Sequence, residues 1–485
     1  MLFDINRFHF FVLLTWQFAI FFASQQIFPI FLNYVPEWQC GDGPIGKNCA
    51  EYDRCGGNVT FIGKVYDSAA LEYGWICSNN YIGTTLLPQA QFLGVLLGTF
   101  SFGTVSDIFG RKPIAIIAMS LGLTMNFITG LASSWKIFLV IRFFVGLSVG
   151  GTLVVVCTFV MEMLLPQQRM ALRAFFNWGV ARLIMTLICL ALPEWRQSSF
   201  ACALAALPAL FILIFIFPES PTWLHNKGRL DDMRKSEMHI AKWAGVEYQP
   251  IEHEKVEHNK TVCELLTSCN LLRRLVVLWL MWFVASICGY ATDLNSNTIS
   301  GDFFLNQILF SILIAASKIA LVIFDSNVPA FSRRSLHQGA QSIVCVCFLI
   351  LTVLTIKEYR GTVILIVSLI GTVFIEYTWD ACYLCAVESM ETAYRASATG
   401  TCSLMARVGA FIAPYLNQAT SVWPPALYLT VVVLGTVNLG MSYFFLVETK
   451  GINLDKVKIP DDDAEDQLIE ATPMVEQPVQ EKSNE

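Results

Sequence analysis

The chain has 485 residues, of which 55% are hydrophobic and 14% are charged, and its formal net charge is −6. Soluble domains carry charge on about a quarter of their residues, so this composition excludes an ordinary soluble protein. No basic patch points to nucleic acid as a partner.

Runs of about 20 apolar residues recur along the whole chain, and each could cross a hydrocarbon core of about 30 Å. We therefore predict an all-α membrane protein with twelve transmembrane helices in two six-helix halves. The first run exceeds the apolar part of a signal peptide and no small-residue cleavage site follows it, so it is interpreted as a retained helix. The predicted spans are 8–32, 82–104, 113–132, 136–165, 171–193, 198–217, 273–293, 303–324, 338–356, 361–387, 397–418 and 424–447.

The polar segment 33–81, which follows the first span, stands out by its cysteines. Most of the 15 cysteines lie in apolar runs, where cysteine behaves as a small hydrophobic residue. This segment instead joins its cysteines to a glycosylation pattern at Asn58, and the pattern recurs by chance at Asn259. We predict an extracellular loop with two disulfides, whose pairing the spacing leaves open. The four cysteines are Cys40, Cys49, Cys55 and Cys77.

Basic residues in the short loops predict which side of the membrane each loop faces. Loops on one side carry more Arg and Lys, and the positive-inside rule puts both termini in the cytoplasm. The segment 33–81 then faces outward, which agrees with its cysteines and its sequon. The residues compared are Arg111, Lys112, Arg169, Arg333, Arg334 and Arg395 on the inner side, and Lys136, Arg196, Lys357 and Arg360 on the outer side.

Two polar stretches complete the predicted organisation. A cytoplasmic linker, 218–272, separates an N-terminal half, 1–217, from a C-terminal half, 273–454. Its histidines have no metal-binding spacing, and we predict no metal, no cofactor and no enzymatic activity. The acidic tail, 455–485, is predicted to be disordered in the cytoplasm.

A repeat relates the two halves. Glu162 precedes Arg169 by seven residues, and Glu388 precedes Arg395 by the same spacing. The last span of each half also ends at a glutamate. Halves related in this way predict a transporter that holds its substrate between them near the membrane midplane. These two terminal glutamates are Glu219 and Glu448.

Two glycine-containing motifs lie in the N-terminal half. In the first, glycines permit a tight turn between spans, and an acid and a basic pair could form a latch between helix ends. In the second, glycines allow two helices to approach closely. The first, GTVSDIFGRKP, contains Gly103, Asp107, Gly110, Arg111 and Lys112; the second, RFFVGLSVGG, contains Arg142, Gly146, Gly150 and Gly151. The predicted conformational latch also includes Arg142, Glu162, Arg169, Glu219, Glu388, Arg395 and Glu448.

These motifs resemble signatures of the major facilitator superfamily. The stretches FPESPTWL at 217–224 and VETKGINL at 447–454, with the large cysteine-bearing loop, are similar to the organic ion transporter family within it, and most like the organic anion branch. The resemblance implies secondary-active transport of a small organic anion across the plasma membrane by alternating access, with exchange for an intracellular dicarboxylate as one form of coupling. The second-half latch, DSNVPAFSRRS, lacks the central glycine.

Cations inside apolar helices are the strongest candidates for substrate binding, because a buried charge in a membrane helix is costly. By resemblance to the anion branch, Arg407 and Lys318 would face the cavity and attract a carboxylate or sulfate. The alternative for either cation is a structural ion pair with Glu376 or Asp380. Asp380 could also bind a co-transported proton or discriminate zwitterions from anions. Arg182 is a third candidate, with snorkelling or pairing to Glu162 as its alternative.

Aromatic residues at matching positions are the remaining candidates. Anion carriers of this family line their cavities with rings that stack on apolar substrates. Core packing or lipid contact is the alternative for each ring. The candidates are Trp178, Tyr290, Trp379 and Tyr383.

Two other functions compete with an organic anion carrier. Glu376 and Asp380 favour an organic cation or zwitterion carrier of the carnitine type. The incomplete second latch favours a non-transporting, receptor-like member.

Overall fold

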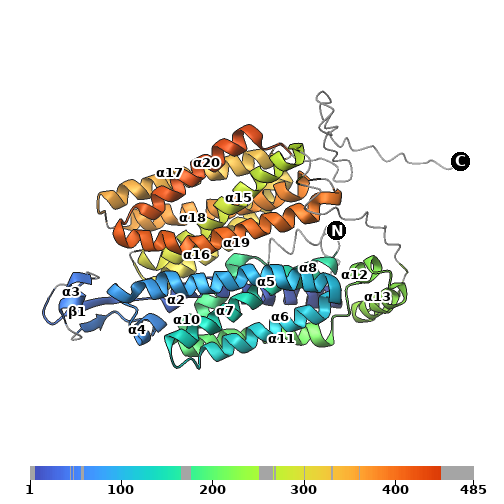
Figure 1. Ribbon diagram of the computed structural model, residues 1–485, viewed down its shortest axis with the longest axis horizontal. Helices are drawn as coiled ribbons and strands as arrows, with labels where there is room; N and C mark the ends of the chain where they lie inside the picture. Colours follow the sequence, from blue (N-terminus) through green and yellow to red (C-terminus); the bar gives the residue numbers. More distant parts are fainter. Residues whose placement is uncertain are drawn as a thin grey trace.

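The computed structural model describes residues 6–43, 45–46, 49–55, 59–164, 176–248, 250, 266, 269–299, 301–328, 331–359, 361–390 and 392–448. Figure 1 shows two helical bundles lying side by side, the first blue to green and the second yellow to red. The first bundle contains α1 (Arg7–Ala23), η1 (Ser24–Gln26), α2 (Pro29–Leu32), η3 (Ile82–Leu86), α5 (Leu87–Phe109), α6 (Arg111–Thr129), α7 (Trp135–Gly151), η4 (Thr152–Val156), α8 (Cys157–Glu162), α10 (Trp178–Ala191) and α11 (Trp195–Phe215). The second contains α15 (Cys269–Asn295), η5 (Ser296–Thr298), α16 (Phe303–Asn327), α17 (Arg333–Ile356), α18 (Thr362–Glu388), α19 (Thr392–Val422) and α20 (Ala426–Phe445).

Each predicted span coincides with helix in the described residues. Ten helical segments are long and apolar enough to cross a membrane, and the shorter apolar helix α10 and the 31-residue α19 account for the other two. The predicted start of the fifth span at 171 lies outside the described residues. Helices α17 and α19 begin five residues before the predicted spans, because hydropathy detects only the apolar part of a helix that extends into a polar layer.

The cysteine-bearing segment folds at one end of the molecule, at the left of Figure 1, which we call the cysteine end. Two disulfides, Cys40–Cys55 and Cys49–Cys77, cross-link this segment, with Cα–Cα distances of 5.9 and 5.3 Å. Asn58 lies outside the described residues. The segment contains β1 (Glu37–Cys40) paired antiparallel with β2 (Val59–Ile62), together with α3 (Cys49–Arg54), α4 (Ala69–Tyr73) and η2 (Cys77–Asn79).

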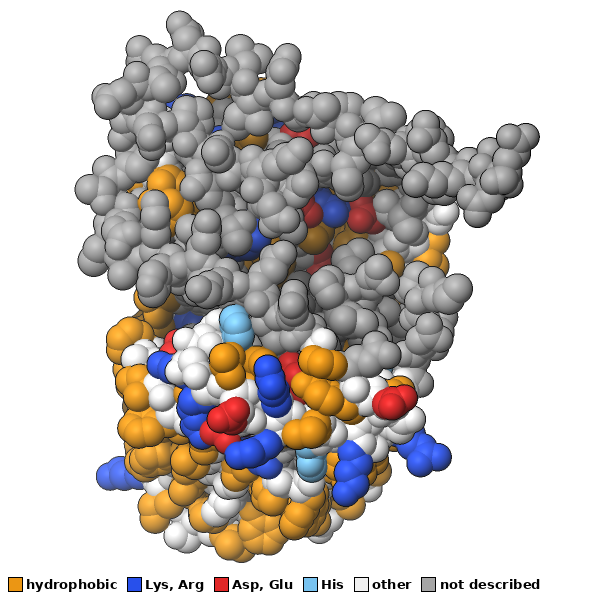
Figure 2. Space-filling view, turned by 90° about the vertical axis from the view of Figure 1, so that its right-hand side faces the viewer, with side chains coloured by type: hydrophobic (Ala, Val, Ile, Leu, Met, Phe, Trp, Pro, Cys, Tyr) orange, Lys and Arg blue, Asp and Glu red, His pale blue; other side chains and the backbone are white. Residues whose placement is uncertain are grey.

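The opposite end, which we call the latch end, carries two short helices of the linker. Figure 2 looks onto this end, where charged and apolar side chains mix over α12 (Pro221–Asn226) and α13 (Leu230–Ala244). Hydrogen bonds from Arg229 and Lys235 hold the pKa of the Asp232 carboxyl below its ordinary value. These charges therefore form a solvated surface network, which contributes little to stability.

Helices α5 and α7 pack backbone to backbone in the first bundle. A Cβ added to Gly146 would lie 2.0 Å from the carbonyl oxygen of Gln91, and one added to Gly150 would lie 2.3 Å from that of Val95. Only glycine permits so close an approach. The glycines of the RFFVGLSVGG stretch therefore allow the close contact between α5 and α7, which we call the α5–α7 seam.

The two bundles contact each other toward the cysteine end. The Phe303 ring lies 4.6 Å from that of Tyr34 and 5.6 Å from that of Phe31. Asn297 donates a hydrogen bond of 3.3 Å to the carbonyl of Asn33. Since these residues adjoin the cysteine-bearing segment, the bundles are closed against each other at this end.

Candidate functional site

The latch end of the first bundle is organised around the turn at Gly110. Its φ of +113° favours glycine, and a Cβ there would lie 2.4 Å from an oxygen of Glu219. Glu219 accepts hydrogen bonds from the backbone N–H groups of Arg111 and Lys112, each at 3.0 Å. The first N–H groups of a helix have no partner within it, so Glu219 caps α6 from the far end of α11.

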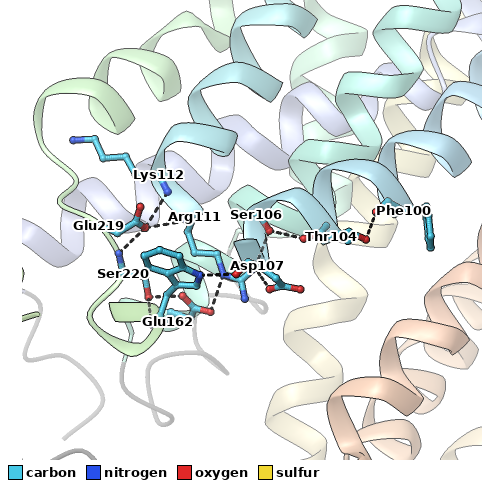
Figure 3. Close-up of polar contacts among 11 residues, drawn as sticks. Phe100, Thr104, Ser106, Asp107, Arg111, Lys112, Glu162, Glu219 and Ser220 are labelled. Atoms are coloured by element: carbon cyan, nitrogen blue, oxygen red, sulfur yellow. Dashed lines mark hydrogen bonds and ion pairs between the residues drawn. The ribbon is translucent and has the colours of Figure 1, made fainter. Parts of the chain in front are cut away.

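Arg111 joins three elements at this turn (Figure 3). Its guanidinium lies 2.7 Å from Asp107 and 3.4 Å from Glu162, and it donates a 2.8 Å hydrogen bond to Ser106. The Ser220 hydroxyl donates to the other oxygen of Glu162 at 2.5 Å. Four of the residues predicted to form the latch, Asp107, Arg111, Glu162 and Glu219, therefore meet within the first bundle. Lys112 also contacts the end of the bundle, where it donates a hydrogen bond to the carbonyl of Phe217 at 2.6 Å. A Cβ added to Gly103 would lie 3.2 Å from the Val154 side chain, so the glycine allows α5 to pack closely against η4.

The second bundle repeats this arrangement without the central glycine. Glu448 accepts hydrogen bonds from the backbone N–H groups of Arg333 at 2.9 Å and Arg334 at 3.1 Å. The Arg333 side chain contacts Asp325 at 2.9 Å and Glu388 at 3.2 Å. The internal repeat seen in the sequence is thus also a repeat of contacts.

The glutamates of the repeated Glu and Arg pairs contact the latch arginines of their own bundles. Glu162 and Glu388 meet the arginines that open α6 and α17, as described above. Arg395 donates to the carbonyl of Met390 at 3.3 Å. Arg169 lies outside the described residues.

Arg142 is fully buried among neutral partners. It donates to Gln91 at 2.7 and 3.2 Å, to Gln25 at 3.0 and 3.3 Å, and to Asn126 at 3.3 Å. Its guanidinium also lies 5.4 Å from the Phe28 ring. Among the described residues no carboxylate contacts it, so its charge is solvated by amides and carbonyls alone.

Arg182 forms the one ion pair that joins the two bundles within the described part of the chain. It lies 2.5 Å from Asp293, donates to Gln307 at 2.8 Å, and its side chain is 1% exposed. Its partner is therefore Asp293 and not Glu162. Sequence reasoning missed Asp293, although an acid at the end of an apolar run was a visible signal.

Lys318 lies between the two acids of α18. Its ammonium contacts Asp380 at 2.8 Å and Glu376 at 3.0 Å, and it donates to the carbonyl of Glu376 at 3.1 Å. The sequence left open whether Arg407 pairs with these acids. Lys318 takes that place, and the three groups together carry one net negative charge.

The two acids share a face of α18 with two aromatic residues. Glu376, Trp379, Asp380 and Tyr383 stand at positions i, i+3, i+4 and i+7, which lie on one side of a helix. Trp282 of α15 packs its ring 4.4 Å from Tyr383 and 5.8 Å from Trp379. Sequence reasoning missed Trp282, because nothing distinguishes it from the other aromatic residues of its helix.

Arg407 has a different environment from the other embedded cations. Its Nε is buried without a hydrogen-bond partner, and it forms no ion pair with a described residue. The Tyr290 phenol of α15 donates a hydrogen bond to Gln26 of the first bundle at 2.8 Å, and its ring lies 4.9 Å from that of Phe92. Tyr290 therefore contacts the first bundle from the second.

Trp178 opens α10 and packs against the core of the first bundle. Within the described residues it shares no ring contact or hydrogen bond with Tyr290, Trp379 or Tyr383. The other site candidates are thus concentrated on α15, α16, α18 and α19, and Arg182 of α10 contacts α15 and α16.

The embedded charges singled out in the two bundles balance by sign. Among the described residues Arg407 alone of the three cations lacks an ion pair. The cations are Arg182, Lys318 and Arg407, and the carboxylates are Asp293, Glu376 and Asp380.

Comparison with known proteins agrees with this architecture. The family model described as sugar (and other) transporter matches residues 54–459. A Caenorhabditis elegans protein, F23F12.3, is 35% identical over 479 residues, covering 93% of this chain and 94% of that protein. An organic cation transporter-like protein of Drosophila melanogaster is 26% identical over 86% of this chain and 76% of its own length. Human solute carrier family 22 member 16 is 26% identical over 81% of this chain and 70% of its own length.

Solved structures show the fold. The proton:xylose symporter XylE of the major facilitator superfamily superposes with a TM-score of 0.65 at 16% identity, covering 92% of this chain and 97% of its own. The twelve-helix prediction is thereby confirmed. The chain belongs to the sugar (and other) transporter family of the major facilitator superfamily and is a multi-pass membrane transporter.

Proposed function

We propose that the chain is a secondary-active carrier of organic zwitterions, small molecules that bear an ammonium group and a carboxylate. The observation that carries this proposal is the distribution of embedded charge. Arg407 forms no ion pair with a described residue, while Lys318 is already shared by Glu376 and Asp380. An anion carrier would use Lys318 as a free positive charge, and its contacts argue against that use.

In this proposal the ammonium group of the substrate binds to the face of α18 that carries Glu376 and Asp380. Glu376 and Asp380 supply negative charge, and Trp379 and Tyr383 lie on the same face. Aromatic rings attract ammonium groups, an interaction of about 0.5–2 kcal/mol. The substrate carboxylate would then form a bidentate pair with the guanidinium of Arg407.

In alternating access across the plasma membrane, this site would be open first to one side and then to the other. The bundles are closed against each other at the cysteine end, and the ion pairs of Arg111 and Arg333 each lie within one bundle. In the proposed orientation the cysteine end is extracellular and both termini are cytoplasmic. The structure would then correspond to a state closed to the outside.

Uptake into proteoliposomes that contain the full chain tests the substrate class. Labelled carnitine and glycine betaine are compared with choline, which lacks the carboxylate, and with 3,3-dimethylbutanoate, the carbon isostere of betaine that lacks the positive charge. We expect the zwitterions to be taken up faster than either single-charge analogue. Equal or faster uptake of choline or dimethylbutanoate would contradict the proposal.

Substitution of Arg407 tests the carboxylate contact. We expect Arg407→Ala to lower zwitterion uptake at least about 10-fold, because charge-assisted hydrogen bonds contribute about 1.5–3 kcal/mol. Arg407→Lys, which retains the charge but loses the fork, serves as the matched control and should retain part of the uptake. Unchanged uptake by Arg407→Ala at equal protein incorporation would remove Arg407 from the site.

An organic anion is the second candidate substrate, and the guanidinium of Arg407, which forms no ion pair with a described residue, favours it. Exchange for an intracellular dicarboxylate would accompany this function. The same liposomes, preloaded with glutarate, would then take up dimethylbutanoate faster than unloaded ones. A receptor-like protein would instead show no flux of any probe.

A further inference from the structure

We propose that the groove between α17 and α20 binds an anionic phospholipid, with its phosphate at Arg334 and an acyl chain along the groove. Figure 1 shows these two helices on the side of the second bundle that lies away from the first. Both are long and apolar enough to cross the membrane, so the groove faces lipid and not the interface between the bundles. Binding there does not depend on which substrate is carried.

Two glycines leave the groove open. A Cβ added to Gly339 of α17 or to Gly440 of α20 would meet nothing within 4 Å. The groove lies near the start of α17 and the end of α20 and has a volume of about 620 Å³. Leu439, Tyr443 and Phe444 also line it. Association within a membrane depends on close packing, because the lipid is as apolar as the helices, and the groove offers an acyl chain more packing than a smooth helix surface.

The internal repeat shows how the same surface is built in the first bundle. Counted from the arginines that open the two helices, Gly339 has the same place in α17 as Ile117 has in α6. Counted back from the capping glutamates, Gly440 corresponds to Phe211 of α11. Ile117 and Phe211 are 53% and 52% exposed. The first bundle thus presents two large apolar side chains where the second has only backbone, so the shared fold does not by itself require the groove.

Arg334 places a positive charge beside the groove. Its guanidinium lies 5.6 Å from the Tyr443 ring, which lines the groove, and donates a 2.5 Å hydrogen bond to the Tyr443 carbonyl. Its neighbour Arg333 is held by two carboxylates of its own bundle, whereas Arg334 forms no ion pair with a described residue. A guanidinium can pair with a phosphate through two parallel hydrogen bonds.

The surroundings of Arg334 also favour an anionic head group. Arg273 of α15 lies 4.6 Å from the Phe445 ring and adds a second cation at this end of α20. The nearby carboxylate of Glu448 accepts the backbone N–H groups of Arg333 and Arg334. In the predicted orientation these residues lie at the cytoplasmic leaflet, whose anionic lipids attract basic side chains. A sterol carries no negative charge for Arg334, so a phospholipid fits the site better.

Photochemical labelling of the full chain in liposomes tests the occupant. Phosphatidylcholine liposomes contain a small fraction of phosphatidylserine with a photoreactive group in its acyl chain, and labelled peptides are mapped after irradiation. We expect residues 335–342 and 436–444 to be labelled at least about 5-fold more by this probe than by the phosphatidylcholine analogue, the preference that one basic residue provides. Excess unlabelled phosphatidylserine should remove the label.

Three outcomes would overturn the proposal. Equal labelling by the two probes would leave only non-selective contact with the bilayer. Labelling that cholesterol removes and phosphatidylserine does not would assign the groove to a sterol. Labelling confined to other helices would exclude the groove. Each of these results leaves substrate uptake untouched, so a failure here is distinct from a failure of the proposed function.

Variants that fill the groove test its place. Gly339→Ile and Gly440→Phe put the side chains of the first bundle into open space. We therefore expect both to melt in detergent close to the wild-type temperature and to lose the preferential labelling. Leu349→Phe, an exposed position of α17 outside the groove, is the matched control and should retain it. Preferential labelling of both groove variants would overturn the site.

Arg334→Gln tests the head-group contact separately. This variant retains the backbone N–H that Glu448 accepts, so the end of the bundle stays capped. We expect the phosphatidylserine probe to label the groove no more than the phosphatidylcholine probe, whose own labelling should not change. An undiminished preference for phosphatidylserine in this variant would remove Arg334 from the site.

Discussion

At the scale of single residues, Lys318 and Arg407 show how far a cation in an apolar helix can be interpreted from sequence. Both are predicted to bind substrate, and both lie in apolar stretches of the sequence with the same formal charge. In the structure Lys318 contacts two carboxylates, whereas Arg407 has no ion pair with a described residue. The difference depends on which helices are neighbours, and sequence spacing within one helix contains no such information.

Trp379 provides a residue-scale prediction about the ammonium end of the substrate. We expect Trp379→Leu to raise the KM for carnitine about 2- to 30-fold, the range that corresponds to a cation–π contribution of about 0.5–2 kcal/mol. Trp379→Phe retains a ring and should have a smaller effect. Initial uptake rates over a range of carnitine concentrations measure this, and equal KM values for the two variants would argue against a cation–π contact.

At the scale of elements, the seam between α5 and α7 is the part of the fold most directly encoded in the chain. Gly146 and Gly150 each face a backbone carbonyl of α5 at a distance that excludes any side chain. Interhelical contacts of this kind depend on small residues, because the lipid provides no hydrophobic force to drive helices together. The glycine spacing therefore determines how the two helices approach.

Replacement of a seam glycine should lower thermal stability. We expect Gly146→Ala to destabilise the purified protein by about 1–3 kcal/mol, the usual cost of overpacking a filled interior. Gly339→Ala on α17, where nothing lies within 4 Å of an added Cβ, is the matched control and should be close to neutral. Thermal unfolding in detergent measures both, and equal melting temperatures would show that the seam can relax.

At the scale of the whole molecule, the sequence predicts the architecture better than the site. Hydropathy is sufficient to predict twelve helices, and the repeated spacing of Glu and Arg is sufficient to predict two related halves, because each signal can be identified within short segments. The pairing of Arg182 with Asp293 joins α10 to α15 across the two bundles. The linker and the rest of the first bundle separate these residues in the chain, so only the folded arrangement reveals the contact.

The same ion pair predicts how the bundles separate. Asp293→Asn leaves Arg182 buried without its charged partner, and breaking a buried pair costs about 3–5 kcal/mol. We expect faster amide hydrogen exchange in 29–36 and 294–304, where the bundles meet at the cysteine end. Glu72→Gln removes an ion pair with Arg196 at the same end but within one bundle, so it serves as the control. Equal exchange in both variants would show that other contacts hold this end closed.

Arg142 has a consequence for the electrical behaviour of the carrier. Its charge is fixed inside the first bundle by amides of Gln25, Gln91 and Asn126, and no described carboxylate cancels it. Rocking of this bundle would carry the charge through part of the membrane field, and a full crossing corresponds to about 2.3 kcal/mol per 100 mV. We therefore expect transient capacitive currents in voltage-clamped cells without substrate, and smaller ones in Arg142→Gln. A carrier of electrically neutral molecules would in this way respond to the membrane potential.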